Sequence, residues 1–463
     1  MADEINKRDY SIDMTEGKVL KKMLAFSFPL MASGMLQLLF NMVDMVIVGR
    51  FAGDICLAAV GATTALSHLV TNTLIGLSIG ANVVIAKAIG SKDLSLVKES
   101  VYNSIIVALL SGVVMGAVGI GLRTTILTTM GTPELVLPYS EKYITIIFLG
   151  SPMVALFNFC ASALKAKGDT RHPLQYLIIS GIINLLLNLI FVIVFKLDVR
   201  GVALATVISQ TISAVLVLNC MLKEKMFYEK GAGTRKLNGE IMADILKIGV
   251  PASVQGILVS LSNMIVQSSV NKFGEVVVAG SAASNSVEHF IFASVNCFAQ
   301  AGVSFTAQNL GANKIDRIPL ITGCTILCAF AGGLISGAGF YIFSDKVMAL
   351  YSSTPEVAAE GVKRMMFICL PYCIFGIMDS FSGILRGLGH AVIPAVSVLA
   401  GTCLFRALWI FGLNFSGFDY TVEYVYMAFP LSWTVTIAIN AICYSRVLKK
   451  LRADYHKKMQ NCS

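Results

Sequence analysis

Three carboxylates lie inside otherwise apolar stretches of the sequence: Asp44, Asp379 and Glu288. An ionised group in a hydrocarbon environment is costly, so it needs a partner, a water-filled cavity or a proton. A low dielectric favours the neutral form of a carboxyl group, which allows protonation to alternate with the binding of a cation. Such a carboxylate can exchange H⁺ for another cation, or it can bind Na⁺ together with amides and hydroxyls. Oxygen ligands alone do not separate these two chemistries.

Amides and one histidine extend this set of candidates. They are Gln37, Asn41, Asn184, Asn188, Gln255, Gln267 and His289. Gln37, Asn41 and Asp44 are spaced i, i+4 and i+7, which predicts that they share one face of a helix, and Asn184 and Asn188 are one helical turn apart. Hydrogen bonding between helices is an alternative role for each amide. For Glu288 and His289 the sequence leaves both a functional and a structural role open.

Other chemistries lack the residues that they require. The sequence has no nucleophile and base constellation and no phosphate-binding loop, and its 11 cysteines are scattered without the spacing of a zinc site. We therefore expect neither an enzyme nor a bound cofactor or metal.

The composition of the sequence predicts the kind of element that holds these candidate site residues. Of 463 residues, 56% are hydrophobic and 14% are charged, against roughly 45–50% and about 25% in soluble domains. Ten stretches without Asp, Glu, Lys or Arg are long enough to span a bilayer as helices of about 20 residues. Two more stretches contain one charge each, Asp379 and Arg406. The sequence therefore predicts an all-α integral membrane protein with twelve transmembrane helices.

An internal repeat groups these helices. At an offset of about 221 residues, Pro29 aligns with Pro251, and the segment 132–134 (Thr-Pro-Glu) aligns with the identical segment 354–356. Each repeat holds six spans, an even number, so the two repeats are expected to enter the membrane in parallel. The three carboxylates do not repeat, which favours a role in binding or coupling over a role in the shared scaffold.

The distribution of Lys and Arg sets the expected orientation. Most of them fall on the side that holds the N-terminus, the central linker and the C-terminal tail, so both termini are predicted to be cytoplasmic. The net charge of +9 then reflects membrane topology and not binding to nucleic acid. The expected divisions are a cytoplasmic segment 1–23, an N-lobe 24–222, a linker 223–244, a C-lobe 245–447 and a tail 448–463.

Three motifs resemble those of the multidrug and toxic compound extrusion (MATE) family, in its bacterial, NorM- and DinF-like branch. They are residues 41–44 (Asn-Met-Val-Asp) followed by 48–51 (Val-Gly-Arg-Phe), 307–312 (Ala-Gln-Asn-Leu-Gly-Ala) and 385–389 (Leu-Arg-Gly-Leu-Gly). The resemblance implies a V-shaped monomer of two six-helix lobes in the cell membrane. It also implies export of organic cations or amphipathic drugs in exchange for H⁺ or Na⁺, with membrane lipids as surroundings.

The resemblance also implies roles for single residues. Asp44 matches the first-helix aspartate implicated in protonation or substrate binding, Asp379 matches the tenth-helix aspartate associated with cation coupling, and Asn184 matches a polar residue of the N-lobe. Two positions depart from the family pattern. Asn188 stands where DinF-like members carry an aspartate, and Val259-Ser260 where NorM-like members carry a glutamate, for which Glu288 is placed to compensate.

The alternative function is a flippase for a lipid or a lipid-linked precursor, in the same superfamily. A pyrophosphate group would favour several arginines in the transport cavity, because their charge and fork geometry match it. Only Arg406 lies clearly within a span, and Arg386 lies near a cytoplasmic end. The residues therefore favour the drug exporter.

Overall fold

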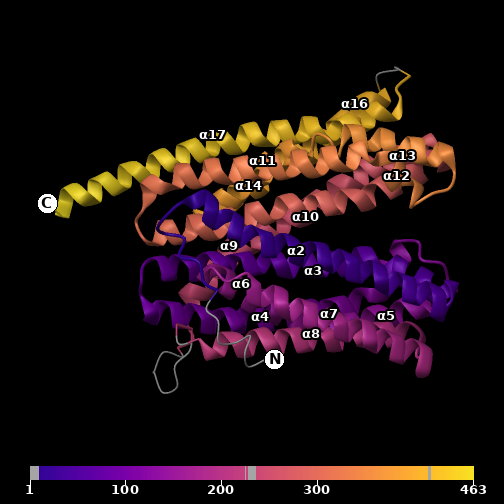
Figure 1. Ribbon diagram of the computed structural model, residues 1–463, viewed down its shortest axis with the longest axis horizontal. Coiled ribbons are helices and arrows are strands. Elements are labelled where there is room, and N and C mark those ends of the chain that lie inside the picture. Colours follow the sequence, from indigo (N-terminus) through magenta and orange to yellow (C-terminus); the bar gives the residue numbers. More distant parts are fainter. Residues whose placement is uncertain (1–9, 225, 228–235, 416–418, 463) are drawn as a thin grey trace. The chain divides into compact units, whose positions relative to one another are not determined.

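The computed structural model describes residues 10–462, apart from 225, 228–235 and 416–418. Every regular element in this part of the chain is a helix (Figure 1). Ten helices are long and apolar enough to cross a membrane, and two bent helix pairs raise the number of spans to twelve if each pair is one span. The expected all-α membrane fold is therefore confirmed.

The long spans follow the same order in the two sequence halves, and the second half contains additional short elements. The first half contains α2 (Val19–Ile47), η1 (Val48–Ala52), α3 (Asp54–Gly90), α4 (Leu94–Thr129), α5 (Leu137–Leu149), α6 (Ser151–Lys167), α7 (Arg171–Leu189), η2 (Ile190–Val194) and α8 (Asp198–Lys223). The second half contains α9 (Gly239–Val270), η3 (Asn271–Phe273), α10 (Glu275–Gly311), η4 (Ile315–Arg317), α11 (Ile318–Ile342), α12 (Ser344–Ala349), α13 (Pro355–Phe367), α14 (Tyr372–Gly387), α15 (Val392–Val398), η5 (Leu399–Leu404), α16 (Phe405–Phe415) and α17 (Val422–Cys462). In each half the fourth span is the bent one, as a repeat requires.

Prolines explain where the fourth spans bend. The α5–α6 pair bends by 44° at Gly150, and Pro152 lies at the start of α6. The α13–α14 pair bends by 47°, and Pro371 is the residue immediately before α14. Proline has no N–H to continue a helix but fits the first turn of a new one. The sequence predicts one span at each place, with a proline that can kink it, and the structure builds each span from two short helices.

The chain forms two compact units, which are described separately below. Unit 1 contains Met1–Asp13 and Ala32–Ser253, and unit 2 contains Met14–Met31 and Val254–Ser463. One boundary precedes Met14, and the other two fall inside α2 and α9, two residues after Pro29 and two residues after Pro251. A proline inside a helix removes one backbone hydrogen bond and allows a kink. The first helix of each sequence half thus changes unit just beyond its proline.

Glycines allow the helices within each unit to approach closely. In unit 1, a Cβ at Gly112 of α4 would lie 2.5 Å from the Cα of Pro152 in α6. In unit 2, a Cβ at Gly383 of α14 would lie 2.5 Å from the carbonyl oxygen of Ala299 in α10. Small residues are the usual means of tight packing between membrane helices, because no hydrophobic driving force acts between them there.

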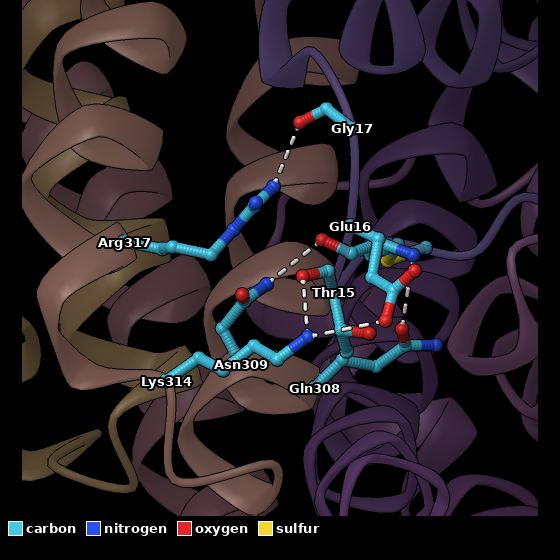
Figure 2. A network of polar contacts seen from close by, with 8 residues as sticks. Thr15, Glu16, Gly17, Gln308, Asn309, Lys314 and Arg317 are labelled. Carbon is cyan, nitrogen blue, oxygen red and sulfur yellow. Dashed lines mark hydrogen bonds and ion pairs between the residues drawn. The ribbon is translucent and has the colours of Figure 1, made fainter.

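The segment 14–17 is anchored to the C-terminal end of α10 and to η4, all within unit 2 (Figure 2). Hydrogen bonds run from Met14 N to Gln308 Oε1 (3.4 Å), from Asn309 Nδ2 to Met14 O (3.0 Å), from Lys314 Nζ to Thr15 O (3.1 Å) and from an Arg317 guanidinium nitrogen to Gly17 O (3.0 Å). The Met14 side chain is completely buried. This segment is therefore part of the folded unit.

Candidate functional site

In unit 1, Asp44, Asn188 and Asn184 form a hydrogen-bonded cluster. Asp44 comes from α2, and the two asparagines come from α7. The Nδ2 group of Asn188 donates to Asp44 Oδ1 at 2.6 Å and to Asn184 Oδ1 at 3.2 Å. Asn188 is 0% exposed and Asn184 is 6% exposed, whereas Asp44 is half-buried. The structure therefore brings three of the predicted site residues together.

The two bonds fix the orientation of the Asn188 amide. Because Nδ2 faces Asp44 and Asn184, the carbonyl oxygen Oδ1 faces away from them, and it has no hydrogen-bond partner among the described residues. An unpaired buried acceptor costs about 1–3 kcal/mol. The phenol of Tyr143, in α5, interacts electrostatically with Asp44. The cluster thus offers a carboxylate and a free amide oxygen, the groups that accept a proton donor or a cation.

Gln37 and Asn41 lie on the same helix as Asp44, and both side chains are exposed. Exposed polar side chains in the middle of an apolar helix favour a face in contact with water over a face in contact with lipid. The stripe that these residues form with Asp44 is therefore suited to line an aqueous path in unit 1.

In unit 2, Asp379 is held by a chain of amides. The Nδ2 group of Asn296 donates to Asp379 Oδ2 at 2.8 Å, and Gln300 Nε2 donates to Asn296 Oδ1 at 2.7 Å. Asp379 is 7% exposed and also interacts electrostatically with Arg386, which donates to Gln255 Oε1 at 2.9 Å. The sequence pattern indicated Asp379 and Gln255 as candidates but not Asn296 and Gln300. Their spacing of four residues in α10 was the available signal.

Glu288 has a different kind of partner. It forms an ion pair with Arg364 of α13 at 2.8 Å, and Arg364 also donates to Ser284 Oγ at 3.2 Å. The side chains are 12% and 7% exposed for Glu288 and Arg364. The neighbouring His289 is exposed. Glu288 and Asp379 therefore have separate hydrogen-bonding partners, and a permanent positive charge compensates the carboxylate of Glu288.

The second half of α9 also has an exposed polar face. Gln267 is exposed, and its Nε2 donates to Asn271 Oδ1 at 2.9 Å. Asn263, one turn earlier, is exposed as well. Among the residues that the structure describes, no group of three or more His, Cys, Asp or Glu side chains is placed to hold a metal ion. The amides of Asn263 and Gln267 are therefore the site groups that this polar face of α9 offers.

Comparison with known proteins identifies the family. The MatE family profile matches residues 29–190 and 251–411, which are the two repeats of the sequence. The chain belongs to the MatE family. The resemblance noted in the sequence is therefore confirmed, and with it the expectation of a membrane transporter that is not an enzyme.

Relatives and solved structures agree with this assignment. The MatE chain is 32% identical to "Probable multidrug resistance protein YoeA" of Bacillus subtilis, covering 82% of this chain and 83% of that one. It is 23% identical to "Probable multidrug resistance protein NorM" of Thermotoga maritima, with 82% of each chain covered. A crystal structure of MATE in complex with MaL6 has the same fold, with a TM-score of 0.89, 18% identity and coverage of 96% of this chain and 100% of that one.

Two of the motifs in this MatE chain have clear structural roles. In the motif 307–312, Asn309 is 0% exposed and binds the carbonyl oxygen of Met14, so it anchors the segment 14–17. In the motif 385–389, Arg386 donates a hydrogen bond to Gln255 and interacts electrostatically with Asp379. These contacts leave no local sequence pattern, because their partners lie far away along the chain.

Proposed function

We propose that the protein is a secondary active multidrug exporter. It would move organic cations or amphipathic compounds out of the cell in exchange for H⁺ or Na⁺, as a monomer in the cell membrane with both termini cytoplasmic. The names of its relatives support the multidrug part of this proposal. The observation that carries the exchange part is the bond between Asp44 and Asn188 beside an exposed polar stripe.

Asp44 is the exchange group in this proposal. Its carboxylate accepts one bond from Asn188, and the protein supplies no cationic side chain as a hydrogen-bonding partner for Asp44 in the described structure. The negative charge is therefore available to H⁺, Na⁺ or the ammonium group of a substrate. Because one carboxylate cannot hold two cations equally well, binding of one cation favours release of the other.

Asp379 forms a second site for a coupling ion. Its carboxylate is buried, and Asn296 and Gln300 hold it in place through a chain of hydrogen bonds. Arg386 already provides part of the countercharge. We therefore assign the larger share of exchange to Asp44 and a supporting share to Asp379, while Arg364 neutralises Glu288.

The test is transport by purified protein in liposomes loaded with a fluorescent organic cation, with a pH gradient and a Na⁺ gradient imposed separately. One gradient should drive movement of the dye in the wild type, and Asp44→Asn should reduce this rate at least tenfold. Glu134→Gln, which changes an exposed loop carboxylate, is the control and should keep the wild-type rate. Full efflux with full coupling in Asp44→Asn would contradict the proposal. Absence of gradient-driven movement of any cationic dye in the wild type would favour the flippase.

A further inference from the structure

Arg406 is a buried cation in unit 2 that the exchange mechanism does not use. It lies in α16 and is 2% exposed. Its Nε donates to Ser432 Oγ at 2.9 Å, and one terminal nitrogen donates to Asn263 Oδ1 at 2.8 Å and to Ser262 Oγ at 3.3 Å. The guanidinium also stacks 4.2 Å above the ring of Phe429. Every one of these partners is neutral.

A buried charge normally has a charged partner, because desolvation is costly. Glu288 is the carboxylate that interacts electrostatically with Arg406, but its direct bond goes to Arg364. The charge of Arg406 is therefore only partly compensated, and its positive potential extends to the groups that it touches.

Asn263 connects the buried Arg406 to the surface of unit 2. Guanidinium nitrogens are donors only, so the amide must turn its oxygen toward Arg406. The Nδ2 group then faces the exposed side of α9, where Asn263 lies. A donor whose oxygen is bonded to a cation is also a stronger donor, because hydrogen bonds in a chain polarise one another.

The internal repeat shows that this arrangement is specific to unit 2. Asn263 aligns with Asn41 of unit 1, and the carboxylate near Asn41 is Asp44. The position in unit 2 that aligns with Asp44 is the apolar Val266. Equivalent asparagines of the two units thus have different surroundings, an aspartate on the same helix in unit 1 and a buried arginine bonded to the amide in unit 2.

We propose that Asn263, oriented by Arg406, is a specificity-determining donor that binds a hydrogen-bond acceptor of the substrate, such as a carbonyl or carboxylate oxygen. This inference rests on the proposed function and narrows its substrate class. Preferred substrates carry an acceptor group in addition to their cationic centre. Arg406 acts as a positioning residue and does not touch the substrate.

The experiment compares two organic cations, a rhodamine methyl ester with a carbonyl acceptor and tetraphenylphosphonium with none. Asn263→Ala should raise KM for the rhodamine ester about tenfold, as expected for one lost hydrogen bond, and leave KM for tetraphenylphosphonium within about twofold. Ser268→Ala is the matched control, since Ser268 is exposed on the same helix and is not a candidate site residue, and both KM values should stay unchanged.

The positioning role of Arg406 is tested by asking whether the effect of its substitution on substrate preference requires Asn263. Arg406→Met should lower the preference for the ester, and the double variant with Asn263→Ala should show no further loss of preference. An equal change of KM for both cations in Asn263→Ala, or no change, would overturn the assignment. Equilibrium binding of both cations to the purified wild type and to Asn263→Ala is measured as well. Absence of transport in the wild type would contradict the proposed function, whereas an unchanged ratio of the two affinities in Asn263→Ala would contradict the role of Asn263.

Discussion

The ion pair between Glu288 and Arg364 predicts a loss of stability that is separate from any effect on ion coupling. Glu288→Gln removes the negative charge and leaves Arg364 buried at 7% exposure with only neutral hydrogen-bonding partners. Breaking a buried ion pair by removing one partner costs about 3–5 kcal/mol, because an uncompensated charge remains. Arg364→Met should cost a similar amount for the converse reason.

The double variant Glu288→Gln with Arg364→Met should recover most of this loss, since no charge then stays buried without a partner. Stability is measured by denaturant unfolding in mixed micelles, and the two single variants and the double variant form a thermodynamic cycle. Glu360→Gln serves as the control. Its pair with Lys363 is 20% and 38% exposed, so its loss should stay below about 1 kcal/mol.

Ion dependence of transport separates this structural role from a coupling role. We expect Glu288→Gln to keep the wild-type dependence on the H⁺ or Na⁺ gradient in the fraction that remains folded. Unchanged stability together with an altered ion dependence would refute the reasoning. It would make Glu288 a coupling residue, as the sequence analysis allowed.

Three further outcomes are expected. Gly112→Ala should destabilise the protein by about 1–3 kcal/mol in the same unfolding assay because its Cβ would meet the backbone of α6, whereas Gly121→Ala in the same helix meets nothing within 4 Å and should not. Asn309→Ala should leave the carbonyl group of Met14 without the donor on Asn309, cost about 1–3 kcal/mol and speed the labelling of a cysteine introduced in the segment 14–17. Unchanged labelling would contradict the anchoring. Burial, followed by the charge of a neighbouring lysine, lowers the pKa of His390 from 6.5. The unfolded chain therefore binds a proton more readily than the folded one, and stability should fall as the pH drops below about 6.5. His390→Asn should lack this dependence in unfolding curves from pH 5 to 7.

The helical architecture could be predicted from the sequence because it depends on local pattern. A stretch without charges and of sufficient length must be a buried or membrane-spanning helix, and the repeat shows how many such stretches belong together. Pro152 and Pro371 indicated that the fourth spans can bend, but their position at the edge of an apolar stretch did not give the size of the bends at Gly150 and before Pro371.

The contacts of the candidate site could be predicted only in part. The spacing of Asn184 and Asn188 placed them on one face, and a buried carboxylate needs a partner nearby. The partner of a buried carboxylate depends on how the helices rotate and pack. The local sequence pattern therefore did not predict the pairing of Glu288 with Arg364, 76 residues away. The exchange roles of Asp44 and Asp379 stay predictions.

The composition of the two units has a consequence for how the chain can be divided. A cut in the connection between α8 and α9 yields two fragments, each with six of the expected spans. The first fragment carries Met14–Met31, which belongs to unit 2, and the second carries the beginning of α9, up to Ser253, which belongs to unit 1. Each fragment therefore lacks a helical piece that the other one holds. Two genes that encode the fragments should complement each other when expressed in the same cell, and neither product should fold alone.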